Sequence, residues 1–443
     1  MELRDLLVTP LVIILIYVVA YLLRSRIPDN TLRKYFLPAL TVRIFGAIAL
    51  GFLYQFYYSG GDTYNFHTHG SRYIWQAFMD SPQVGFKLLT SQGDYFPGSY
   101  QYVSRMLFYT DSSSYFVIRL AAVFDLITFS SYSATAVLFS VIAFAGSWCL
   151  FTTFYRQAKH LHGWLAGAIL FLPSVVFWGS GLLKDTITLA ALGFLTYAIY
   201  NQFIVKKIRL GNILIGLLGI WVLFVVKKYI LLCYLPAALL WVAASNLARI
   251  KSVVIKLMLV PGMLALLGVT GFYAVVLIGE DDPRYSLDKI ALTAKITAYD
   301  IGFYSGRDAG SGYSLGELDG TFTNLLSKFP QAVNVSLFRP YLWEVRNPLM
   351  VLAALESLVL LVLTLYVFFK IRFHVGKVFT NPQVIFCFMF SIAFAFSVGV
   401  STYNFGTLTR YKIPLLPFYL VGLIFLLNQT KSETKVDSLA ITE

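Results

Sequence analysis

Charged residues are scarce in this sequence: 13% of its 443 residues are Asp, Glu, Lys or Arg, while 58% are hydrophobic. Soluble domains contain about 25% charged residues, so a soluble globular protein is excluded. The apolar residues form long blocks and not the alternating pattern of membrane β-strands. Helices are the other structure that crosses a bilayer, so the sequence predicts an all-α, polytopic integral membrane protein.

Cysteine is also rare. The three cysteines, Cys149, Cys233 and Cys387, all lie inside apolar segments, which argues against a disulfide framework or a thiolate metal cluster. The phosphate-loop spacing GxxxxGK[ST] is absent, and so are kinase, hydrolase, zincin and thiol-redox signatures. No complete metal-ligand set is visible, so the sequence leaves the need for a divalent cation or another cofactor open.

Eleven apolar segments approach the roughly 20 residues that a helix needs to cross hydrocarbon. They are residues 6–23, 38–58, 134–155, 164–179, 186–205, 210–226, 229–247, 257–279, 348–369, 382–400 and 414–428. The net charge of +13 comes from Lys and Arg clusters in every second connection between the predicted spans, which is the positive-inside pattern. Because the charge is explained in this way, it does not indicate a nucleic-acid partner. This pattern predicts one membrane domain over residues 1–443 in a bacterial inner membrane, with the N-terminus outside and a cytoplasmic tail at 429–443.

Two long outer loops follow from this topology, residues 59–133 and residues 280–347, and both are expected to carry interfacial helices. Within the first loop, residues 115–131 are apolar enough to cross the membrane. A crossing there would place Arg119 and Asp125 at a costly depth and reverse the charge pattern of every later connection. We therefore expect an interfacial helix at 115–131.

The second loop combines a glycine-rich stretch with an aromatic end. The stretch Gly302–Gly320, which includes Arg307, is interpreted as a mobile segment that orders on substrate binding. Aromatic rings stack on sugar rings, so the end of the loop predicts either a polar substrate groove or an interfacial re-entry. The residues concerned are Arg339, Tyr341, Trp343 and Glu344.

Asp62 is the strongest candidate for chemistry in the first loop. It follows two glycines that release the chain from the second span, and it precedes an expected helix at 63–79. A carboxylate at the membrane boundary can act as a general base, although Asp is also among the best helix N-caps. His67 and His69 are two residues apart, which points them to different faces of a helix, so we expect surface or interfacial histidines.

Two basic sites lie at outer turns. Lys184 follows a glycine- and serine-containing turn before a spanning helix, where free backbone N–H groups and an ammonium suit a phosphate. An ordinary interfacial pair of Lys184 with Asp185 is the alternative. Arg410 and Lys412 precede the last span and suit either phosphate binding or anchoring to lipid headgroups.

Two charged residues fall within expected spans. Glu356 lies about two turns into its span and should face the protein interior or a cavity, because intramembrane acids are expensive. Arg43 lies near the inner end of the second span, where we expect its long side chain to reach the headgroups.

Four stretches, in this order along the chain, resemble the GT-C superfamily of membrane glycosyltransferases, which use polyprenyl-phosphate-linked donors. They are Gly61-Asp62-Thr63-Tyr64, the segment Trp178 to Asp185, the segment Phe338 to Glu344, and Arg410 to Pro417. The sequence departs from the family in placing its acidic residue after the second span instead of the first. It also has no large C-terminal soluble domain.

The resemblance implies roles for these residues. Asp62 would be the catalytic base that deprotonates or positions the acceptor, with Asp94 or Asp125 as candidate acidic partners. Lys184, Arg410 and Lys412 would bind the donor phosphate, and Tyr64 would join the loop residues around Tyr341 in a substrate groove. The expected reaction is inverting transfer of a sugar from a lipid-linked donor to a glycan, lipid or protein acceptor on the outer face, in cell-envelope glycan or glycolipid synthesis.

Two other functions fit the same topology. An O-antigen or exopolysaccharide polymerase or ligase would act on longer lipid-linked glycans, and the second loop is large enough, although it contains no histidine. A lipid-linked glycan transporter, a flippase or a non-catalytic membrane partner belongs to another class. A transporter predicts interrupted helices with polar residues near the midplane of the membrane.

Overall fold

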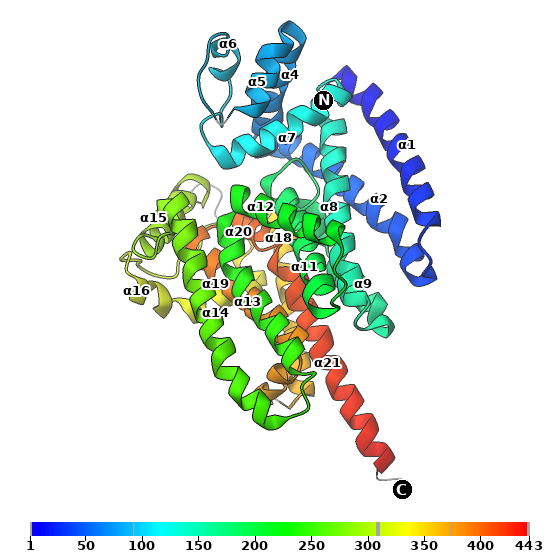
Figure 1. The fold of residues 1–443 in the computed structure, drawn as a ribbon. Coiled ribbons are helices and arrows are strands. Elements are labelled where there is room, and N and C mark those ends of the chain that lie inside the picture. The colour runs from blue at the N-terminus through cyan, green and yellow to red at the C-terminus, as the bar shows by residue number, and fades with distance from the viewer. Residues whose placement is uncertain (1, 92, 307–310, 373, 441–443) are drawn as a thin grey trace. The chain divides into compact units, whose positions relative to one another are not determined.

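The computed structural model describes residues 2–91, 93–306, 311–372 and 374–440, and within these ranges every regular element is a helix. The chain divides into two compact units, one comprising Met1–Ala198 with Arg209–Lys227 and the other comprising Ile199–Ile208 with Lys228–Glu443 (Figure 1). We describe each unit separately.

Seven helices in the described part of the chain are long and apolar enough to cross a membrane. They are Leu3–Ser25 (α1), Asn30–Tyr57 (α2 with η1), Tyr132–Tyr155 (α8), Lys184–Ile204 (α11 with η4), Lys228–Leu247 (α13), Pro348–Lys370 (α18) and Pro382–Thr402 (α19). A further pair, Phe405–Tyr411 (α20) and the start of Leu415–Ala440 (α21), passes the same test but is bent by 65°. The protein is therefore an α-helical membrane protein.

The other expected spans differ in form. Residues 164–179 make two short helices, His162–Ile169 (α9) and Pro173–Trp178 (α10), because the proline at position 173 starts a new helix. Leu210–Val226 (α12) is apolar but has only 17 residues. The segment 257–279 belongs to Val253–Asp281 (α14) and falls partly on side chains outside the described residues.

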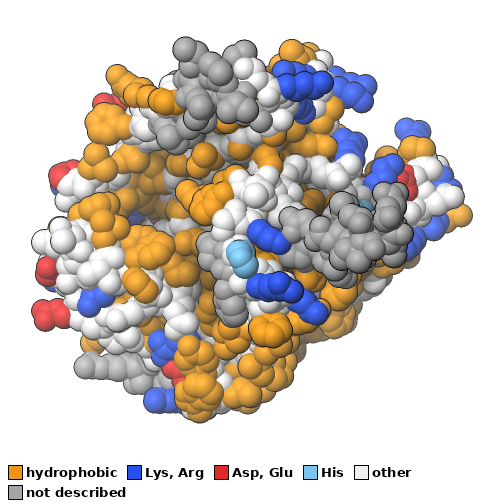
Figure 2. All heavy atoms as spheres, turned by 90° about the horizontal axis from the view of Figure 1, so that it is seen from below, with side chains coloured by type: hydrophobic (Ala, Val, Ile, Leu, Met, Phe, Trp, Pro, Cys, Tyr) orange, Lys and Arg blue, Asp and Glu red, His pale blue; other side chains and the backbone are white. Residues whose placement is uncertain are grey.

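Large hydrophobic side chains are widely exposed, as a bilayer requires. On α1, Leu7, Leu11 and Leu15 are each more than 60% exposed. Figure 2 shows hydrophobic side chains over much of the face seen there. In water such a surface would be unfavourable, because burial of apolar area is the main force that drives folding and association.

In the first unit, α2 packs on α8 and α10, and Arg43 of α2 lies at the centre of this packing. The guanidinium is 1% exposed and donates hydrogen bonds to the carbonyl oxygens of Val175 (2.8 Å) and Gly179 (2.9 Å) and to the Ser147 hydroxyl (2.7 Å). Our expectation that Arg43 reaches the headgroups is therefore wrong. The Val175 carbonyl also accepts from the Gly179 N–H (3.1 Å), and Gly179 itself lies just past the end of α10, so the arginine supplies donors where the helical hydrogen bonds end.

Residues 59–133, predicted as the first outer loop, form a series of helices. They are Asp62–Phe66 (α3), His67–Ser71 (η2, a π-helix), Arg72–Asp80 (α4), Pro82–Thr90 (α5), Tyr100–Val103 (α6) and Ser112–Thr128 (α7). The helix predicted at 63–79 is thus formed by α3, η2 and α4. The segment predicted at 115–131 is helical as α7.

His67 is not at a surface. Its side chain and that of Asp125 are both fully buried, with His67 Nε2 3.4 Å from Asp125 Oδ1. The hydroxyls of Ser71 (2.6 Å) and Thr135 (2.7 Å) donate to the same carboxylate. The expectation of surface histidines holds only for His69, which is exposed. A polar residue on the inner face of a loop helix is buried when another helix, here α7, covers that face.

The second unit is built around α19, which packs against α13, α21 and Phe329–Phe338 (α17). Trp241 and Phe386 stack at 4.5 Å in its core. The loop before α18 also contains Pro283–Tyr285 (η5), Ile290–Gly306 (α15), Phe322–Ser327 (α16) and Leu342–Glu344 (η6).

The glycine-rich stretch is described in part, and its residues 311–316 contact the turn between α19 and α20. Tyr313 N–H donates to the Tyr403 carbonyl (3.1 Å), Phe405 N–H donates to the Ser311 carbonyl (2.8 Å), and the Tyr313 hydroxyl donates to the Gly399 carbonyl (2.9 Å). Ordering of this stretch on substrate binding stays a prediction. Arg307 lies outside the described residues.

Candidate functional site

Asp62 is the first residue of α3, and the residue that caps this helix is Gly61, with φ of 119°. A side chain at Gly61 would meet the Tyr54 ring at 2.9 Å and would also be strained at this positive φ. The N-cap interpretation of Asp62 is therefore wrong. Its half-buried carboxylate instead exerts an electrostatic effect on Lys184.

Lys184 begins α11 and is held by the start of α7. Its Nζ donates to Asp111 Oδ2 (3.2 Å) and to the Ser113 hydroxyl (2.7 Å). Asp111 is the N-cap of α7, and its side chain also accepts from the Ser114 N–H at 3.3 Å. Burial alone would raise the pKa of Asp111, but the Lys184 ammonium and the two serine hydroxyls hold this pKa below its ordinary value.

The next residue, Asp185, pairs with Lys227 at the end of α12 and not with Lys184. The Asp185 side chain is fully buried and the Lys227 side chain is 9% exposed. The pair joins the start of α11 to the end of α12. Lys227 also acts electrostatically on Lys184, so the two pairs form one group of charges.

We call this group the carboxylate–lysine cluster. It consists of Asp62, Asp111, Asp185, Lys184 and Lys227. The side chains of Lys184 and Asp111 are 19% and 45% exposed. The Asp185–Lys227 pair is buried. Three carboxylates face two ammonium groups, so a phosphate near Lys184 has to compete with Asp111.

The structure places the candidate acidic partners elsewhere. Asp125 is buried with His67 as described above, and Asp94 is exposed. The acid beside Lys184 is Asp111, which the sequence analysis did not single out. A Ser-rich helix start at 111–114 predicts an N-cap at Asp111, but no sequence signal connects it with a lysine 73 residues later.

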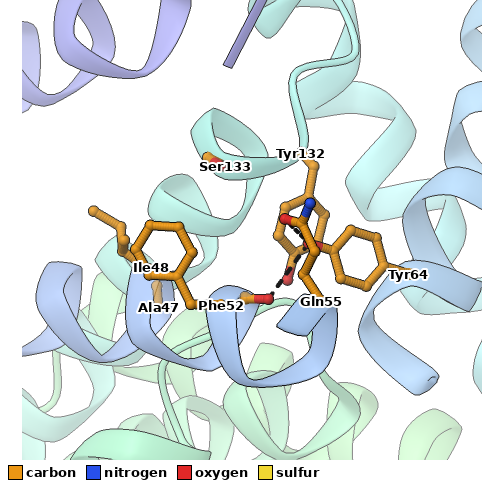
Figure 3. A pocket seen from close by; sticks show the side chains of 8 residues that line it. Ala47, Ile48, Phe52, Gln55, Tyr64, Tyr132 and Ser133 are labelled. Carbon is orange, nitrogen blue, oxygen red and sulfur yellow. Dashed lines mark hydrogen bonds between the residues drawn. The ribbon is translucent and has the colours of Figure 1, made fainter. Parts of the chain in front are cut away.

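Tyr64 lies on α3 and stacks on Tyr132 of α8, with ring centroids 4.3 Å apart. Its hydroxyl donates to the Gln55 carboxamide oxygen (3.2 Å) and lies 3.4 Å from the Gly51 carbonyl (Figure 3). Burial raises the pKa of Tyr64 to about 12, so this hydroxyl is a proton donor at neutral pH. Thr63 adds a hydrogen bond to the Tyr132 hydroxyl at 2.8 Å.

In the second unit, Arg339, Tyr341 and Glu344 form one local network. Arg339 Nε donates to Glu344 Oε2 (3.0 Å), and a second bond joins the other atoms of this pair. Glu344 also accepts from the Tyr341 N–H at 2.8 Å. Tyr341 stacks on Trp343 at 4.7 Å, and Trp343 is 81% exposed. An exposed aromatic stack beside an ion pair is suited to a sugar or a headgroup.

The two basic residues before the last span differ. Lys412 is buried at the break between α20 and α21, where its Nζ donates to the Ser357 hydroxyl (3.2 Å) and Glu356 lies within electrostatic range. It is therefore not available to a headgroup at the surface. Arg410 is half-buried and lies 5.7 Å over the Tyr411 ring.

The Arg339–Glu344 pair gives a pH-dependent prediction. Burial alone would raise the pKa of Glu344, but the bonds from Arg339 and the Tyr341 N–H lower it below the ordinary 4.5. Such a group contributes stability above its unfolded pKa, and this contribution is lost as the pH falls through the folded value. We expect Glu344→Gln to lower the free energy of unfolding by about 1–2 kcal/mol at pH 7, and this difference to shrink as the pH falls below 4.5 and through the folded pKa of Glu344. A constant difference in thermal unfolding from pH 7 to pH 3 would contradict the pair's charge.

No three His, Cys, Asp or Glu side chains among the described residues are grouped so that they could hold a metal ion. In comparisons with known proteins, no family model matches the chain, and no curated protein or solved structure is significantly similar to it.

Proposed function

We propose that this protein is a membrane glycosyltransferase that transfers a sugar from a polyprenyl-phosphate-linked donor to an acceptor outside the cytoplasm. The proposal follows the resemblance to the GT-C superfamily. The observation that supports it best is the position of Lys184, whose Nζ bonds to Asp111 (3.2 Å) and Ser113 (2.7 Å) of the same loop that carries Asp62, because a base and a phosphate-binding cation are the two groups that such a transfer needs.

The proposed reaction is a single inverting displacement. The acceptor oxygen forms a bond to the anomeric carbon while the bond from that carbon to the phosphate oxygen breaks. Asp62 takes the proton of the acceptor hydroxyl. Lys184 stabilises the negative charge that builds on the leaving phosphate. Because Asp111 occupies Lys184 in the structure, the donor phosphate displaces this carboxylate when it binds.

The proposal includes a topology of eleven spans in a bacterial inner membrane, with the N-terminus outside and the C-terminus in the cytoplasm. Under this topology Asp62, Asp111, Lys184 and Lys227 all fall on the outer side. The short pair α9 and α10 would together make one crossing, with Arg43 satisfying the carbonyls at its end.

Variants of Lys184 and Asp111 test the proposal, because it predicts that they change the KM for the lipid-linked donor in opposite directions. Lys184→Met should raise the KM for the lipid-linked donor about tenfold or more, since a charged hydrogen bond to phosphate is lost. Asp111→Asn should lower this KM, because it removes the competitor of the phosphate. Purified protein in proteoliposomes, supplied with polyprenyl-phosphate sugars, gives both values through the released polyprenyl phosphate.

Lys87→Met is the control, because this lysine is exposed in the loop that contains Asp111. If Lys184→Met and Asp111→Asn both raise the KM, Asp111 positions Lys184 and does not compete with the phosphate. If wild-type protein transfers no sugar from any polyprenyl-phosphate donor, the proposed function itself is wrong. Formation of long chains in the same assay would instead identify a polymerase.

One observation favours a second candidate, a transporter of lipid-linked glycans. The last span is broken, with a bend of 65° between α20 and α21, and the buried Lys412 lies at the break. Interrupted helices with polar residues line the substrate sites of many transporters. Movement of a fluorescent lipid-linked sugar across proteoliposomes, without any transfer product, would establish this candidate. Lys412→Met should abolish that movement.

A further inference from the structure

The proposed reaction makes no use of the fully buried pair of His67 and Asp125. The Asp125 carboxylate accepts hydrogen bonds from the hydroxyls of Ser71 (2.6 Å) and Thr135 (2.7 Å). A hydroxyl carries no net charge, and a carboxylate that is buried without a cation is strongly disfavoured. His67 Nε2 lies 3.4 Å from Asp125 Oδ1, so the imidazole is the group that can supply the positive charge.

The imidazole of His67 is itself unsatisfied in the structure. Neither of its ring nitrogens has a hydrogen-bond partner, and a buried polar atom without a partner costs free energy. The separation of 3.4 Å between His67 and Asp125 exceeds the roughly 2.7–2.9 Å of a charged N–H···O bond. Uptake of a proton by the imidazole would provide Nε2 with an acceptor and the carboxylate with a counter-charge in one step.

The charges around this pair favour a proton on His67. Asp5 of α1 is a second buried carboxylate and acts electrostatically on Tyr132, whose ring lies 5.5 Å from the His67 ring. Two buried carboxylates near one imidazole favour its cationic form. The other charged groups on the helices packed against η2 are engaged elsewhere: Asp62 and Asp111 act on Lys184, Arg72 pairs with Glu2 (2.7 Å), Asp80 accepts from the Tyr102 hydroxyl (2.8 Å), and Arg119 donates to the Ser91 carbonyl (3.0 Å).

The pair lies at an irregular segment of the backbone. His67 is the first residue of the π-helix η2, and His69 inside it has non-helical φ and ψ of −103° and 22°. π-Helices are rare and occur mostly as single turns within α-helices, frequently at functional sites. His67 and Ser71 are the two ends of η2, and both lie against Asp125. This one carboxylate therefore fixes η2, and α3, which begins at Asp62, leads directly into η2.

We propose that the His67–Asp125 pair is a pH-sensitive contact that holds η2 against α7 while His67 carries a proton and releases η2 when this proton is lost. Histidine gains or loses a proton between about pH 5 and 8. A charged pair of this kind contributes stability at low pH, and the contribution is lost as the pH rises and the folded histidine loses its proton. Release of η2 also frees α3 and the position of Asp62. The inference does not rest on the proposed glycosyl transfer.

Hydrogen exchange of the backbone amides of residues 62–71 measures this contact in the full-length protein in nanodiscs. After correction for the intrinsic rate at each pH, exchange in the wild type should accelerate about tenfold or more from pH 6 to pH 9. His67→Gln should remove this dependence, and Asp125→Asn should reverse it, because an imidazolium then lacks its counter-charge at low pH. The matched control is His69→Gln, which changes the exposed histidine of η2 and should keep the wild-type dependence. A wild-type rate that is independent of pH, or an unchanged dependence in His67→Gln, would overturn the proposal.

NMR of isotope-labelled histidine observes the proton directly and leaves both members of the pair intact, so it remains decisive if the variants at positions 67 and 125 do not fold. The chain contains five histidines, and replacement of the other four by glutamine leaves the imidazole signal of His67 alone. Both of its ring nitrogens should carry a proton at pH 6, and only one of them at pH 9. A neutral imidazole at pH 6, or one that keeps both protons at pH 9, would contradict the proposal.

Discussion

Asp62→Asn should lower the kcat of sugar transfer by about 10²–10⁴ while the KM for the lipid-linked donor stays unchanged. This range is the usual contribution of a general base. The side chain keeps its size and its place at the first turn of α3, and only the carboxylate that we propose as the base is lost. Transfer assayed in proteoliposomes at saturating donor and acceptor concentrations gives the kcat.

The matched control is Asp80→Asn, because Asp80 is another carboxylate of the same loop that accepts a hydrogen bond from the Tyr102 hydroxyl at 2.8 Å. It should keep full activity. An Asp62→Asn variant with wild-type kcat would exclude Asp62 from the proton transfer.

The second large effect concerns stability. Lys227→Met should destabilise the protein by about 3–5 kcal/mol, because it leaves Asp185 fully buried without its partner charge. Asp185→Leu should cost a similar amount for the same reason. The double variant should regain most of this loss, since replacement of both members of a buried pair by apolar residues is often neutral.

Denaturant unfolding in detergent micelles measures these differences. Arg284→Met, which removes an ion pair whose arginine is 71% exposed, is the control and should change the free energy of unfolding by less than about 1 kcal/mol. If the double variant is as unstable as Lys227→Met, the two residues do not act as a pair. If the double variant is stable but inactive, the charge of Lys227 is also needed for activity.

The helical membrane architecture followed from the sequence because hydropathy alone determines which segments are long and apolar enough to cross. The seven spanning helices coincide with seven predicted segments, and α7 with a predicted helix. Hydropathy did not show the break within 164–179, which depends on the proline at position 173 and on the carbonyl groups that Arg43 satisfies.

The candidate site was less accessible from sequence. Asp62 and Lys184 were selected from local patterns, a double glycine and a helix start. Their relation to Asp111 depends on how α7 packs, which no local pattern contains. The burial of His67 and Lys412 was not predicted for a similar reason. Histidine and lysine are exposed on average, but whether a given side chain is buried depends on the helices that pack over it.

Sidedness is the premise of the whole account: the helix that begins at Asp62 and the end of the second loop must face the same compartment. Single cysteines at the exposed positions Gln83, Leu342 and Ile208, in a protein without Cys149, Cys233 and Cys387, test it with an impermeant thiol reagent on intact spheroplasts. We predict labelling at positions 83 and 342, and labelling at position 208 only after permeabilisation. Labelling of 83 and 342 from opposite sides would contradict the account.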